Sequence, residues 1–229
     1  MKKFLCLLLV VLLVISLGGC FGESANTDVR GDIVTGDPNQ TQSQTQGKNE
    51  PEFSLGKVAS NTYKNDYLGI SCTLPAPWVF YSDDEIMALN NIVGDYLEEE
   101  IADRIKNASI IYDMYASVAE TGDSININLE KLNAVQVINL DIKKTLESQI
   151  DMIKSAYQNI GYTDIQVNYQ KVSIDGKEFD ALKIIAKIQG IDFYGTCFAF
   201  RRGTYLANVS ICSLQTDNFD TVSGYFTVK

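Results

Sequence analysis

The sequence predicts an α+β fold, an antiparallel β-sheet meander flanked by helices in an α/β/α sandwich. The apolar residues switch along the chain between a period of two and a period near 3.6, so both strands and helices are expected. Turn pairs such as Asp175-Gly176 separate the later strand-like runs closely enough for hairpins. In "IDFYGTCFAF" (191–200) both alternating sets are largely apolar, which is typical of a strand covered on both faces. The two long helices are therefore expected on opposite faces, or on one face with the closing helix on the other.

The first half of the domain combines a strand, a helix and two further strands. "YLGISCTLP" (67–75) predicts a strand, or a short strand pair that turns at Gly69. Ser82 and Glu85 form a capping-box pattern, and the apolar spacing after them predicts a helix to about residue 107. Strand-like runs over 109–118 and 124–129 follow.

The second half begins with an amphipathic helix and continues as a meander. Apolar residues recur at helical spacing over 142–160, and Gly161 is the expected left-handed cap. Four strands are expected next, over 164–173, 178–188, 191–201 and 204–213. A short helix over 217–226 is expected to close the domain.

The segment before Cys20 has the features of a secretory signal peptide over residues 1–19. Lys2 and Lys3 are followed by an apolar run, 4–17, and by small residues. The run is too short for a membrane-spanning helix, which needs about 20 apolar residues. An ordinary signal peptide that happens to contain a cysteine is the alternative to a lipoprotein signal.

"LGGC" (17–20) resembles the lipobox of bacterial lipoproteins. The resemblance implies cleavage before Cys20, a diacylglycerol on its sulfur, and a lipid-anchored protein on the extracytoplasmic face of the cell membrane. Two acyl chains give stable anchoring where one is marginal. The polar stretch 20–55 is then expected to be a disordered linker, and 56–229 a single domain.

Charge and composition exclude several classes of function. The net charge is −10, from 29 acidic and 19 basic residues, which argues against nucleic acid as a partner. The chain contains no histidine, so Ser-His and Cys-His nucleophiles and histidine-ligated zinc are excluded. Neither a phosphate-binding nor a calcium-binding loop motif is present, and no metal or cofactor is expected. We expect a protein that is not an enzyme, although a hydrolase using only carboxylates stays open.

Three cysteines remain in the domain, Cys72, Cys197 and Cys212, and all lie in strand-like runs. Without CxxC spacing, they are expected to be small buried hydrophobic residues. A Cys197–Cys212 bridge across a hairpin is the alternative, because the extracytoplasmic compartment permits disulfides.

A few residues are candidates for ligand binding. Asn126, Asn128 and Glu130 share one strand face, which would either line a polar groove for a sugar or form a solvated sheet rim or edge. Trp78, the only tryptophan, would either stack on a sugar or fill the core beneath the first helix.

The element order over 62–229, with "LPAPW" (74–78) and "SININLEKL" (124–132), resembles the PsbP-like fold. That fold is shared by the oxygen-evolving extrinsic protein of photosystem II, the Ran-binding Mog-type import factor and extracytoplasmic lipoproteins of Gram-positive bacteria. The resemblance implies a non-catalytic interaction module and transfers no catalytic residues. The expected function is a surface-anchored module for a protein or cell-envelope partner. A small-molecule or carbohydrate-binding domain is the alternative, and a carboxylate-dependent hydrolase comes third.

Overall fold

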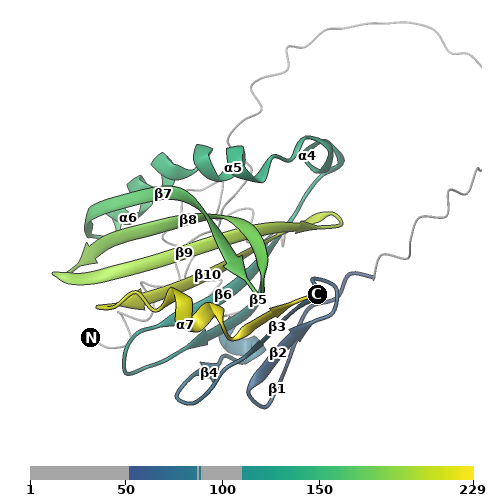
Figure 1. The fold of residues 1–229 in the computed structure, drawn as a ribbon, viewed down its shortest axis with the longest axis horizontal. Helices are drawn as coiled ribbons and strands as arrows, with labels where there is room; N and C mark the ends of the chain where they lie inside the picture. Colours follow the sequence, from purple (N-terminus) through teal and green to yellow (C-terminus); the bar gives the residue numbers. More distant parts are fainter. Residues whose placement is uncertain (1–51, 87, 89–109) are drawn as a thin grey trace, which may run out of the picture.

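The computed structural model describes residues 52–86, 88 and 110–229 of the chain (Figure 1). The predicted signal peptide (1–19), Cys20, most of the linker and most of the predicted first helix lie outside the described residues. Within the described ranges, no helix is both long enough and apolar enough to cross a membrane. Packing onto the domain begins before the predicted boundary at Gly56, because the ring of Phe53 stacks on Tyr205 with 4.2 Å between centroids.

A seven-stranded antiparallel sheet runs through the described part of the chain in the order β4-β5-β6-β10-β9-β8-β7. The four predicted strands of the second half are confirmed as β7 to β10, and Asp175 and Gly176 both take the positive φ of a type I′ hairpin turn. The strands are β4 (Val79–Phe80), β5 (Ile110–Ser117), β6 (Ser124–Lys131), β7 (Tyr162–Ile174), β8 (Lys177–Ile188), β9 (Ile191–Arg202) and β10 (Tyr205–Leu214).

Helices cover one face of this large sheet. The predicted helix over 142–160 is two helices, because Gln149 ends one and precedes the next, and Gly161 has the expected left-handed φ of 93°. Leu146 and Tyr157 are buried against Phe193 and its neighbours in the sheet. The helices of this region are α4 (Ala134–Asn139), α5 (Ile142–Ser148) and α6 (Ile150–Asn159).

A second, smaller sheet covers the opposite face, where the sequence predicts a helix. Its order is β1-β2-β3-β11, and its buried residues Tyr63 and Cys72 belong to the same core cluster as Ile127 and Phe198 of the large sheet. The closing helix does contribute Val222 to this face, but it is short and Phe226 begins a strand instead of ending the helix. The elements are β1 (Lys57–Ala59), β2 (Thr62–Asn65), β3 (Ile70–Thr73), α7 (Phe219–Ser223) and β11 (Phe226–Val228).

The α+β class and the single domain are thus confirmed, while the layer beneath the large sheet is β rather than α. The strands of the small sheet have three or four residues each. Such short strands show too few alternations for a period of two to stand out. The turn expected at Gly69 is confirmed, since it lies between β2 and β3 with φ 70°.

The bridge considered between Cys197 and Cys212 is not formed. Both thiols are free and buried, as is Cys72. The strand register explains this: Cys197 lies opposite Ser210, and Cys212 lies opposite Gly195. The two cysteines are therefore diagonal neighbours, at a typical Cα separation of about 7–8 Å, which is too long for a disulfide. Burial raises the pKa of each thiol to about 12.

Candidate functional site

The two sheets are joined along one side and separated along the other. On the joined side, the backbone N–H of Val228 in β11 donates to Oδ2 of Asp175 in the β7–β8 turn at 3.0 Å. On the other side lie the edge strands β1 and β4, and a pocket of about 810 Å³ opens between them. We call this pocket the edge groove; its lining comes from Gly56, Lys57, Val58, Ser60, Asn61, Trp78, Val79, Phe80, Tyr81, Ser82, Asp83, Glu85, Ile86, Asp113, Met114 and Tyr115.

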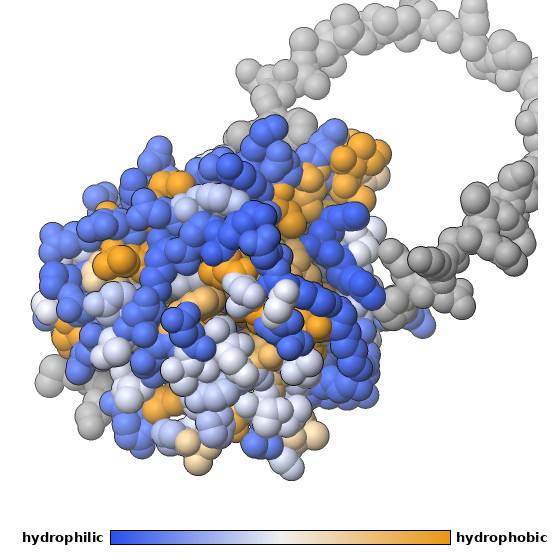
Figure 2. Space-filling view, viewed as in Figure 1, coloured by the Kyte–Doolittle hydropathy of each residue, from blue (hydrophilic) through white to orange (hydrophobic). Residues whose placement is uncertain are grey.

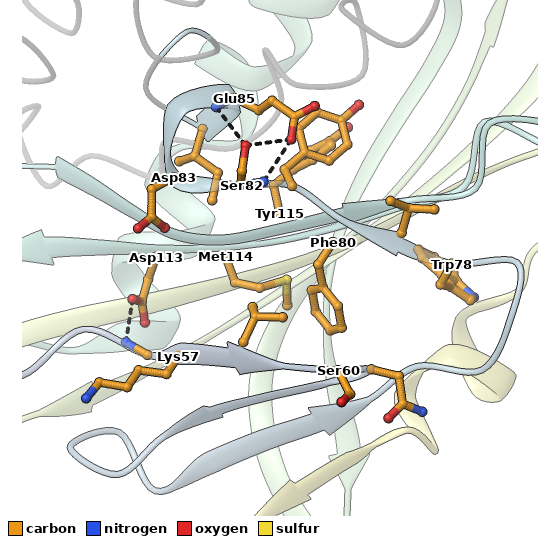
Figure 3. A pocket seen from close by; sticks show the side chains of 16 residues that line it. Lys57, Ser60, Trp78, Phe80, Ser82, Asp83, Glu85, Asp113, Met114 and Tyr115 are labelled. Atoms are coloured by element: carbon orange, nitrogen blue, oxygen red, sulfur yellow. Dashed lines mark hydrogen bonds between the residues drawn. The ribbon is translucent and has the colours of Figure 1, made fainter.

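The edge groove has an aromatic end and an acidic end. In Figure 3, Trp78 stands at one end and the carboxylates of Asp83 and Asp113 at the other, with Phe80 and Met114 between them. Trp78 is half-buried and also packs against the core, so the structure gives it a place in the groove as well as a packing role. Its predicted contact with the first helix lies outside the described residues.

Two valines on the rim of the groove are unusually accessible. Val58 of β1 is 46% exposed and Val79 of β4 is 63% exposed. They lie on edge strands of different sheets, and an exposed apolar side chain on a strand edge favours pairing with another chain.

Local hydrogen bonds hold β4 in place beside β5. The N–H of Trp78 donates to the carbonyl of Pro75 at 3.1 Å, and the N–H of Tyr81 donates to the carbonyl of Tyr115 at 2.9 Å. The rings of Tyr81 and Tyr115 meet edge to face at 4.5 Å. The prolines before Trp78 suit an edge position, since proline cannot donate to a strand partner.

Asp113 is a partly buried acid of the groove, and a β-bulge accounts for its position. The register between β5 and β6 shifts between Tyr112 and Met114, so Asp113 is the extra residue. Its Oδ2 accepts hydrogen bonds from Tyr63 Oη at 2.5 Å and Asn65 Nδ2 at 2.7 Å, and its Oδ1 accepts from the Gly56 N–H at 2.7 Å.

Opposing effects act on the pKa of Asp113. Burial raises the pKa above the ordinary value of an aspartate, and the charge of Asp83 raises it too, whereas the hydrogen bonds from Tyr63, Asn65 and Gly56 lower it. The net direction is upward, because the cost of removing a charge from water exceeds what the three donors return.

The arrangement of these acids favours a structural role over acid-base catalysis. Both oxygens of Asp113 accept hydrogen bonds from β2 and the segment before β1. Glu85 is engaged as well: its Oε2 accepts from the N–H and the hydroxyl of Ser82, each at 2.8 Å, and these bonds lower its pKa. These bonds confirm the expected capping box. Because Asp113 and Glu85 are both engaged in hydrogen bonds, Asp83 is the groove acid most accessible to a cationic group of a partner. No cluster of acidic or cysteine side chains suited to a metal ion occurs among the residues that the structure describes.

The strand face predicted to bind a ligand lies inside the protein. Asn126, Asn128 and Glu130 are all buried, because β6 lies in the middle of the large sheet and not at a rim or edge. The amide of Asn208 on β10 donates to Oδ1 of Asn128 at 3.1 Å. The side-chain amide atoms of Asn126 are buried, and within the described part of the chain they have no hydrogen-bond partner. Alternation of polar and apolar residues marked the two faces correctly, but it could not show that both would be covered.

The most important groove residues, Asp113 and Val79, were not singled out from the sequence. One signal for Asp113 was present: it is the one charged residue in the apolar run "IIYDMYAS". A second signal is the pair Ser60-Asn61, which separates the short strands β1 and β2 of a hairpin. Ser60 takes a positive φ of 55° in this turn.

No protein-family model matches the chain, and no curated protein matches it. Several solved structures are similar to it, among them one cyanobacterial and one mycobacterial protein. The solution structure of cyanobacterial PsbP from Synechocystis sp. PCC 6803 is 14% identical with a TM-score of 0.44, covering 77% of this chain and 98% of that one. The crystal structure of LpqN, involved in cell envelope biogenesis of Mycobacterium tuberculosis, is 10% identical with a TM-score of 0.39, covering 70% and 83%. Both TM-scores lie below 0.5, so neither structure transfers a partner or an activity to this chain.

Proposed function

We propose that this protein is a non-catalytic binding module, anchored to the extracytoplasmic face of the cell membrane through Cys20. Its edge groove takes up an extended segment of a protein partner. The observation that supports this function is the position of the groove: it lies between the edge strands of both sheets.

Strand addition is the binding mode that fits this position. All residues of β1 are exposed, and one side of β1 faces no other strand of the described chain. An extended peptide that pairs with such an edge gains main-chain hydrogen bonds, while pockets for alternate side chains give specificity. Here Phe80, Met114 and the half-buried Trp78 offer the apolar surface for those side chains.

The charges of the groove select a cationic segment. Asp83, Glu85 and Asp113 line it against one cation, Lys57. The whole chain carries a net charge of −10, so its field attracts a basic partner over a longer range. Complementary charge of this kind contributes more to association rate and specificity than to affinity.

A carbohydrate is the second candidate, because Trp78 lies in a groove that also holds carboxylates. An aromatic ring beside acidic acceptors suits a sugar, with its apolar face and its hydroxyls. The candidate face around Asn126 offers no support for this function, since it is buried.

The anchor is tested by changing the cysteine that would carry it. In cells fed a clickable fatty acid, the wild-type protein should be labelled and sediment with membranes. Cys20→Ser should abolish the label and move the protein to a soluble fraction. Labelling that survives Cys20→Ser, or membrane sedimentation of a Cys20→Ser chain from which residues 1–19 have been removed, would contradict the proposed anchor.

The groove is tested by photo-crosslinking in intact cells. A photoreactive residue in place of Val79 should form adducts whose partner peptide is extended and rich in Lys or Arg. The matched control is Ile185 on β8, an exposed apolar residue outside the groove (37% exposed). Adducts that form equally at both positions, or at neither, would refute the groove as the binding site.

A further inference from the structure

One end of the domain carries exposed apolar side chains on a helix that is well formed despite its length. In α4, Val135 is 55% exposed and Ile138 is 80% exposed, and no residue of this helix is buried. A capping box nonetheless fixes its start: the Gln136 N–H donates to Oδ1 of Asn133 at 2.9 Å, and the Asn133 N–H donates to Oε1 of Gln136 at 2.8 Å. Figure 2 shows an apolar group of atoms at the upper right, where Figure 1 places α4.

Basic residues lie at the same end of the large sheet as the start of this helix. Arg201 and Arg202 end β9 just before the β9–β10 turn, and Lys131 ends β6; all three are exposed. The Leu132 N–H donates to the carbonyl of Thr204 in that turn at 2.8 Å, which places the turn beside the start of α4. On a chain of net charge −10, this end therefore combines apolar and cationic groups.

The chain from the predicted anchor reaches the domain at the same end. Phe53 stacks on Tyr205, and Tyr205 is the register partner of both Lys131 and Arg202. The nearby acid Asp66 is paired with Lys64 at 2.7 Å. The described chain therefore begins beside the surface that holds Arg202 and Lys131, and a lipid on Cys20 would be connected to the domain at this surface.

We propose that α4, Lys131 at the end of β6 and the Arg201–Arg202 pair at the end of β9 form a membrane-contact surface that rests on anionic lipid. Each part has a physical role. Cations near an anionic leaflet contribute roughly 1 kcal/mol each, about a fivefold change in affinity. Exposed aliphatic side chains on a short helix add binding by entering the interface between headgroups and acyl chains. With this end on the membrane, the edge groove stays free for a partner, because it lies between β1 and β4 and shares no residue with this surface. The orientation rests on the proposed anchor, but the surface itself is testable without the lipid.

The test uses the mature chain, 20–229, with Cys20→Ser, and sedimentation with vesicles of phosphatidylglycerol and phosphatidylcholine or of phosphatidylcholine alone. We expect binding to the anionic vesicles, at least about tenfold weaker for Ile138→Glu. Lys131→Gln combined with Arg201→Gln should weaken it about 25-fold, from roughly fivefold for each cation. The matched controls, Val79→Glu and Lys57→Gln in the edge groove, should bind as the parent does.

Three results would overturn the proposal: no binding to anionic vesicles, equal binding to both vesicle types, or equal losses in the groove controls. Self-association abolished by Ile138→Glu would assign the surface to a second copy of the chain instead. An environment-sensitive dye on Ile138→Cys, with Ile185→Cys as control, keeps the test valid if a charge variant folds poorly. Failure of this proposal can be distinguished from failure of the proposed lipid anchor. The vesicle assay uses the unlipidated chain, so its result does not depend on whether Cys20 carries a lipid in cells.

Discussion

The phenol of Tyr63 in the small sheet donates a 2.5 Å hydrogen bond to Oδ2 of Asp113 in the large sheet. Asn65 shares that oxygen, and Gly56 binds the other one. One bulged residue thus connects β2 and the segment before β1 to β5, and it lies at the acidic end of the edge groove. This partly buried acid thereby connects the two sheets beside the edge groove.

Replacing Asp113 should lower stability more than replacing any other groove acid. Asp113→Ala leaves the donors of Tyr63 and Asn65 without their acceptor, at a cost of about 2–4 kcal/mol in the free energy of unfolding. Asp83→Ala, which removes an exposed acid of the same groove, should stay within about 0.5 kcal/mol. Urea unfolding of the two variants and the parent measures the difference. Equal losses would show that Asp113 does not connect the sheets.

The raised pKa of Asp113 makes stability depend on pH in a defined direction. Because the folded-state pKa lies above the unfolded value of about 3.8, the folded protein holds the proton more tightly than the unfolded chain. The contribution of Asp113 to stability is therefore fully present below the unfolded pKa and is lost as pH rises through the folded one. As pH rises from below the unfolded pKa through the folded-state pKa, the free energy of unfolding of the parent should fall relative to that of Asp113→Asn. A difference that stays flat, or grows, with rising pH would show that the pKa is not raised.

The cysteines of the domain should resist thiol reagents while the protein is folded. Cys72, Cys197 and Cys212 are buried, and burial raises the pKa of each to about 12, so almost no thiolate forms at neutral pH. In the chain 20–229 with Cys20→Ser, an aromatic disulfide reagent should label none of them in buffer and all three in denaturant. Rapid labelling in buffer would contradict their burial. Failure to label two of them in denaturant would indicate a disulfide.

The closed side of the sandwich should depend on the carboxylate of Asp175. Its bond to the Val228 N–H joins β11 to the β7–β8 turn, and a hydrogen bond of this kind contributes about 1 kcal/mol. Asp175→Gly keeps the positive φ of the turn but removes the acceptor, so the Val228 amide should exchange with deuterium faster. Asp175→Asn, which retains an oxygen, is the matched control. Unchanged exchange in the glycine variant would show that the bond contributes nothing.

The residues that could be predicted from the sequence are those whose periodicity runs over many turns or strands. The meander from β7 to β10, the Asp175-Gly176 turn and the Ser82–Glu85 cap rest on local spacing, which survives folding. The small sheet could not be predicted in the same way, because β11 pairs with β3 across most of the chain and each strand is short. The groove combines β1, β4 and β5, so its position depends on that long-range pairing. The face of Asn126 was expected to be accessible because alternation reports which residues share a face and not what covers it.

The central claim is that the edge groove binds an extended cationic segment. It is tested most directly through the fluorescence of Trp78, the only tryptophan of the chain. Peptides of alternating apolar and basic residues would be selected on the mature protein and titrated while its fluorescence is followed. We predict saturable changes in Trp78 emission, lost with Val79→Glu or Asp83→Lys and kept with Ile185→Glu. Binding that leaves the emission unchanged, or that persists in both groove variants, would contradict the account. A response to oligosaccharides and not to peptides would assign the groove to a sugar instead.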